Sequence, residues 1–132
     1  MLPCLMLACE QSAKGRSTSS EEDFERKRAC AEAGRVRLEE ETRKEHQDIE
    51  PLVSAHWCYS TTLNTCIYES DKRVVIRNPK SPNERPQMIF MSRSAVDLLT
   101  NQTLFGVVGE NESPEKHSDY AKKLAELFKT CQ

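Results

Sequence analysis

Cysteine is the residue type in this sequence that offers the most chemistry. The 132 residues contain six cysteines, a share that is high for a protein of the reducing cytosol. They stand at Cys4, Cys9, Cys30, Cys58, Cys66 and Cys131. No pair has the Cys-x-x-Cys spacing, so thioredoxin-like redox chemistry has no support in the sequence.

His56 and Cys58 could do chemistry of another kind. They lie two residues apart and would share one face of a strand. There they could form a Cys–His nucleophile, or a zinc site together with Cys66 and Cys131. However, the spacings match no short zinc-knuckle pattern, and no nucleophile signature surrounds the pair. A small cytosolic Cys/His enzyme, or a redox or metal protein, is therefore the alternative interpretation.

The first nine residues have the character of an export signal. Residues 2–8 are apolar or small, and a polar stretch begins at Glu10. The order Leu5-Met-Leu-Ala-Cys9 resembles the end of a bacterial lipoprotein signal. The resemblance implies that the chain is cut before Cys9 and that the Cys9 thiol carries lipid, while residues 9–19 form a flexible tether. The alternative is an apolar N-terminus that packs on the domain or on a partner.

Loss of residues 1–8 and lipidation of Cys9 would leave an even number of cysteines. The remaining four can pair in three ways. We expect the disulfides Cys30–Cys66 and Cys58–Cys131. The alternative Cys58–Cys66 bridge would close a shorter loop and constrain the unfolded chain less. Free buried thiols are a further alternative.

Short motifs around these cysteines carry a second resemblance. Cys30-Ala31, the run from Tyr59 to Tyr68 with its Leu-Asn-Thr-Cys segment, and Asp97-Leu-Leu-Thr-Asn follow in that order. This order resembles small exported bacterial proteins, including lipoproteins, that have no assigned function. The resemblance implies that the helix cysteine and the Cys66 position go together, and it supplies no catalytic residues.

Residues 19–47 are predicted to form one long helix. Ser19 or Ser20 can cap it, and the acidic residues that follow suit the positive end of the helix dipole. Its apolar stripe is thin, so we expect the helix to lie on the surface of a domain and to bury one narrow face. Pro51 is expected to end it.

The middle of the chain is predicted to be an antiparallel meander. Strands are expected at residues 53–59, 66–68, 73–77 and 87–92, with turns at 60–64 and 69–72. A short helix is expected to start at Ser94. The three prolines of residues 78–86 indicate an exposed loop.

The last element is predicted to be an amphipathic helix. Ser113 is its expected N-cap, and Pro114 takes the first helical position. The fold class is therefore α+β: a small antiparallel sheet of three to five strands covered by a long N-terminal helix and a C-terminal amphipathic helix. We expect a signal-like segment at residues 1–8, the tether at residues 9–19 and one domain at residues 20–132.

The segment between residues 72 and 93 is rich in basic residues and contains six of them but only one acidic residue. Such a segment could contact an acidic partner, phosphates or anionic lipid, or it could face the acidic long helix or water. We expect a protein partner to bind through Arg73, Arg77, Lys80 and Arg85.

The overall composition narrows the function. With 19 basic and 21 acidic residues the net charge is -2, so nucleic-acid binding is not expected. The sequence has no strained, glycine-flanked serine nucleophile and no phosphate-binding loop. We therefore expect a non-enzymatic binding or structural domain without cofactor or metal. It would be exported to the bacterial envelope and lipid-anchored there, with a cytoplasmic location as the alternative.

Overall fold

The computed structural model describes the backbone of residues 2–78, 80–81, 83–109 and 112–131, and side chains from residue 20 onward. The elements are α1 (Leu2–Thr42), β1 (Ile49–Ser60), β2 (Thr65–Ile76), β3 (Gln87–Asp97), β4 (Gln102–Val108) and α2 (Pro114–Phe128). The strands form one antiparallel sheet in the order β1-β2-β3-β4. The predicted α+β class is confirmed.

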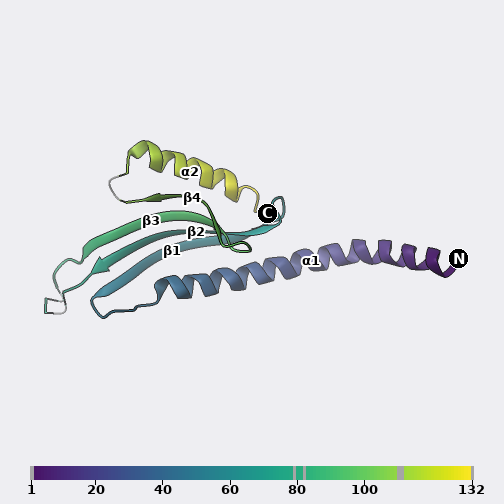
Figure 1. The fold of residues 1–132 in the computed structure, drawn as a ribbon, viewed down its shortest axis with the longest axis horizontal. Helices are drawn as coiled ribbons and strands as arrows, with labels where there is room; N and C mark the ends of the chain where they lie inside the picture. Colours follow the sequence, from purple (N-terminus) through teal and green to yellow (C-terminus); the bar gives the residue numbers. More distant parts are fainter. Residues whose placement is uncertain (1, 79, 82, 110–111, 132) are drawn as a thin grey trace.

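The two helices lie on opposite faces of the sheet (Figure 1). On β2, Cys66 points to the face that α1 covers, while Glu69 points to the face that α2 covers, as the alternation of side chains along a strand requires. A helix on each face leaves the sheet as the middle layer of the domain.

Helix α1 differs from the prediction at both ends. It runs from Leu2 to Thr42 rather than over residues 19–47, so the expected flexible tether at residues 9–19 has a helical backbone. The reason is local: the sequence has no proline between Pro3 and Pro51 to stop a helix. Pro51 does not end α1 but lies inside β1, an edge strand that tolerates its missing N–H.

Strand β2 is one strand and not two. The turn predicted at residues 69–72 is wrong, because these residues continue the pairing with β1 and β3. Their polar side chains are held by other elements: Glu69 contacts His56 and Tyr120, and Asp71 lies beside Arg93. Tertiary partners thus override a local preference for a turn.

The helix predicted at Ser94 is also wrong. Ser94 and the three residues after it continue β3, and Ala95 and Val96 are buried there. The chain turns only after Asp97, and Asn101 takes a left-handed backbone conformation (φ 56°) at the end of that turn.

The contact between α1 and the sheet depends on a glycine. Gly34 faces the indole ring of Trp57, and a Cβ on Gly34 would overlap that ring. The Trp57 N–H donates to the carbonyl of Ala31 at 3.2 Å, and the Trp57 ring stacks on Tyr68 with centroids 5.8 Å apart. The helix therefore approaches β1 closely enough for its cysteine to reach β2.

The predicted start of α2 is confirmed. The Ser113 hydroxyl accepts from the Lys116 amide at 3.3 Å, and Pro114 follows at the first helical position. Tyr120 is the buried residue of this helix, and its ring packs edge-on against Phe105 of β4.

Candidate functional site

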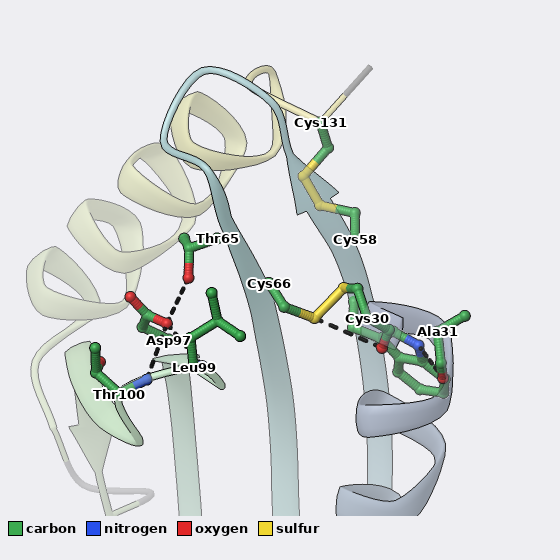
Figure 2. The surroundings of a disulfide bond; sticks show 10 residues. Cys30, Ala31, Cys58, Thr65, Cys66, Asp97, Leu99, Thr100 and Cys131 are labelled. Carbon is green, nitrogen blue, oxygen red and sulfur yellow. Dashed lines mark hydrogen bonds between the residues drawn. A yellow bond between two sulfur atoms is a disulfide. The ribbon is translucent and has the colours of Figure 1, made fainter. Parts of the chain in front are cut away.

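Both expected disulfides are present, and they lie at the same end of the sheet (Figure 2). Cys30 of α1 joins Cys66 of β2, with Cα atoms 5.3 Å apart. Cys58 of β1 joins Cys131, which follows α2, with Cα atoms 5.8 Å apart. Each helix is therefore covalently fastened to the sheet.

The sheet register explains why the alternative Cys58–Cys66 bridge does not form. Cys58 is paired with Ile67, whereas Cys66 is paired with Tyr59. Residues directly opposite each other share a face, and the next residue along points to the other face. The side chains of Cys58 and Cys66 therefore point to opposite faces, one toward each helix.

These bridges decide the chemistry of four cysteines. Cys58 has no free thiol for a nucleophile pair with His56, and Cys66 and Cys131 have no thiolate for zinc. In the part of the chain that the structure describes, no cluster of three or more histidine, cysteine or acidic side chains could hold a metal ion. Cys9 lies among the residues whose side chains are outside the description.

A carboxylate ties the β3–β4 turn to the start of β2 beside the disulfides. Asp97 accepts hydrogen bonds from the Thr65 hydroxyl at 2.5 Å, the Leu99 amide at 2.9 Å and the Thr100 amide at 3.4 Å. Burial alone would raise the pKa of Asp97, but these hydrogen bonds outweigh it and hold the pKa below its usual value. The charged form of Asp97 therefore stabilises the turn.

A polar cluster joins α2 to the sheet on the opposite face from α1. Glu69 lies 3.2 Å from Nδ1 of His56 and accepts from the Tyr120 hydroxyl at 3.4 Å. The Arg93 guanidinium lies 4.6 Å from the centre of the Tyr120 ring, close to Asp71. Burial first, and then the charge of Glu69, raises the pKa of Tyr120. This phenol therefore stays protonated and serves as a hydrogen-bond donor that holds the helix.

The four basic residues expected to bind a partner do not form one cluster. Arg77 is paired with Glu50 of β1 at 2.5 Å, and Arg73 lies 3.6 Å from Asp71. Lys80 and Arg85 are exposed in the β2–β3 connection, and no ion pair involves either of them among the described residues. Of these four exposed basic residues, the two without an acidic partner among the described residues are thus on the connection.

Sequence reasoning missed Asp97, Glu69 and Tyr120 as structural links. For Asp97 a signal was present, since an aspartate two residues before a turn amide can cap that turn through its side chain. For Glu69 and Tyr120 there was none, because they are separated by 51 residues and meet only in the folded chain.

Comparison of the chain with protein-family models, curated proteins and solved structures found no match. Among the residues that the structure describes, neither helix carries an apolar stretch that could cross a bilayer.

We predict that replacing both cysteines of either disulfide substantially lowers the free energy of unfolding. The bridges close loops of 36 and 73 residues, for which loop-closure entropy gives about 4 kcal/mol each, and less for each when both are present because the loops overlap. Denaturant unfolding of Cys30→Ala/Cys66→Ala and Cys58→Ala/Cys131→Ala measures the loss. Thiol titration of the denatured, non-reduced chain is the control, and labelling of all four of these cysteines would contradict the pairing.

We also predict that Asp97 makes stability depend on pH at the acidic end. Because the folded pKa lies below the usual value of 3.8, the stabilisation is present above about pH 4 and is lost as the pH falls through the folded pKa. Asp97→Asn should cost about 1 kcal/mol near neutral pH, since the site is partly exposed. The cost should vanish in acid. A cost that is the same at both pH values would contradict the role of the charge.

Proposed function

We propose that this chain is an exported, lipid-anchored domain of the bacterial envelope that acts without catalysis, as a binding or structural module. The observation that carries the proposal is the pair of disulfides that fastens each helix to the sheet. Disulfides that are part of the structure persist in oxidising compartments and are rare in the cytosol. A chain that relies on them for the position of both helices is suited to an extracytoplasmic location.

The course of α1 supports an anchor at its N-terminal side. The N-terminal half of this helix extends past the sheet and ends far from the other elements (Figure 1). Between Cys9 and Cys30, the residue that is bonded to the sheet, the helix rises by about 30 Å at 1.5 Å per residue. A lipid on Cys9 would therefore hold the domain at a distance from the membrane through a helical spacer.

The position of the exposed basic connection favours a protein partner over the lipid of the same membrane. The β2–β3 connection, which includes Lys80 and Arg85, lies at the end of the sheet opposite to the projecting part of α1 (Figure 1). An anchor at Cys9 would direct this end away from the bilayer. An acidic protein surface is the ligand that two exposed cations on such a connection would attract.

Substitution of Cys9, with Cys4 as the control position, tests the proposed lipid anchor. Cys9→Ser should move the protein from the membrane fraction to the soluble fraction, because the acylated thiol is lost. Cys4→Ser is the matched control and should leave the distribution unchanged, since residue 4 is removed with the signal. Intact mass of the native protein reads out the cleavage, the acyl chains and the disulfides together. An unacylated chain that still begins at Met1 would refute the anchor.

A second prediction concerns the β2–β3 connection as the surface that binds the protein partner. The double substitution Lys80→Glu/Arg85→Glu should reduce capture of a cross-linked partner from envelope extracts several-fold, because attraction to an acidic surface becomes repulsion. Lys27→Glu/Arg28→Glu on α1 makes the same change of charge away from the connection and should capture normally. Equal capture by the two variants would remove the β2–β3 connection from the interface.

A further inference from the structure

The outer edge of β4 lacks proline and charge, two of the features that normally protect an edge strand, although its register with β3 shifts between Ala95 and Val96 and α2 packs on one face. The seven residues Gln102–Val108 include no proline and no charged residue, and Leu104 and Val108 are 43% and 60% exposed. The other edge strand, β1, contains Pro51 and Glu50 and is covered by α1. Proline and charge are usual protections against strand addition, so β4 is the edge better suited to pairing.

The register of β4 places free backbone groups on this edge. The Gly109 amide donates to the Met91 carbonyl at 2.8 Å, and Val107 and Phe105 lie opposite Arg93 and Ala95. Because hydrogen bonds in an antiparallel ladder involve alternate residues, the N–H and C=O groups of Gly106 and Val108 point outward. These groups could form the ladder of an added strand.

A groove lies beside this edge, between β4 and α2. The part of the groove beside the N-terminal half of α2 has a volume of about 450 Å³ and is lined by the consecutive residues 105–108 and by the helix. The part beside the C-terminal half of α2 has a volume of about 710 Å³ and is lined by Phe105 and by the helix. Since four consecutive strand residues line it, the groove follows the open edge of β4 itself.

The groove beside α2 is lined by the charged residues Glu112, Lys116, Asp119, Lys122, Lys123, Glu126 and Lys129. Four of them, Lys116, Asp119, Lys123 and Glu126, follow one stripe of α2 and alternate in sign. A twofold rotation centred on the middle of the helix places Lys116 opposite the Glu126 position and Asp119 opposite the Lys123 position. These four charges are therefore complementary to those of a second copy in antiparallel orientation.

One twofold axis can relate both β4 and α2 to the same elements of a second copy. Tyr120 at the middle of α2 packs on Phe105 near the middle of β4, and its ring also contacts Arg93 of β3. Because α2 packs on β4, a twofold axis at the outer edge of β4 places α2 of both copies on the same face of the joined sheet. The two α2 helices would therefore lie next to each other across the junction.

We propose that the chain forms a twofold dimer in which β4 pairs antiparallel with β4 of a second copy around Gly106. The two sheets become one continuous sheet, and the two α2 helices pack side by side over the junction. Asp119 of each copy meets Lys123 of the second copy, and Lys116 meets Glu126. Lys116 also has Glu112 at 3.0 Å in its own chain, so the Asp119–Lys123 contact is the clearer one to test. This inference is independent of the lipid anchor and of the basic connection.

The test is the oligomeric state of the full chain with both disulfides intact, measured by sedimentation velocity over a range of concentrations. Cys4 and Cys9 are replaced by serine in every variant, so that their thiols cannot link two copies. Lys123→Glu should raise the dimer dissociation constant about tenfold, because both symmetric contacts become repulsive. The charge swap Asp119→Lys/Lys123→Glu should restore the dimer, and Lys27→Glu, which makes the same change on α1, should not affect it.

A second variant tests the strand edge. Val108→Pro removes an outward N–H without removing a hydrogen bond to β3, and it should give a folded monomer, with the fold checked by its melting temperature. A wild type that stays monomeric at all concentrations overturns the proposal. So does a dimer that survives Lys123→Glu, or a charge swap that fails to restore the dimer.

Discussion

Two covalent bonds hold the helices of this protein on either side of a single open sheet, and the other contacts depend on them. In the described part of the chain the sheet has four strands and no second sheet to pack against, so each face needs a helix to cover its apolar side chains. The buried apolar side chains are few, and Cys30 and Cys66 are among them. In such a small interior, cross-links that restrict the unfolded chain replace part of the stability that apolar burial gives to larger domains.

The polar middle of β2 has a second role, which is to orient α2. Glu69 receives the Tyr120 hydroxyl, and Arg93 of β3 lies against the same ring. At the disulfide end, the Ser60 hydroxyl donates to Thr130 at 2.7 Å just before Cys131. The helix is thus fixed along its length by polar contacts and at its end by a covalent bond. This arrangement explains how a strand with polar residues along its middle, Glu69 to Arg73, can lie inside the sheet.

The surfaces that our proposals use lie on separate parts of the single chain. The projecting half of α1 would lead to the membrane, the β2–β3 connection lies at the far end of the sheet, and the edge of β4 lies on the side away from β1. Because antiparallel pairing of β4 with β4 reverses the strand direction, the two α1 helices would project from opposite ends of the dimer. Each basic connection would then lie at the end from which α1 of the second copy projects, so the dimer cannot hold both copies on one membrane in the orientation proposed for the single chain.

The sequence alone indicated features that follow from near neighbours and from residue pattern: the capped start of α2 at Ser113 and the α+β class. It favoured the two disulfide pairs among three possible pairings, and the register of β1 and β2 decided between them. Only the tertiary structure decided that residues 69–72 and Ser94 belong to strands, since their polar or helix-favouring side chains gain partners from distant elements. It also decided that Arg73 and Arg77 lie beside acids of the same chain, whereas Lys80 and Arg85 have no acidic partner among the described residues. The physical reason is that local propensities are worth less than about 1 kcal/mol per residue, whereas pairing on both sides of a central strand satisfies every backbone group at once.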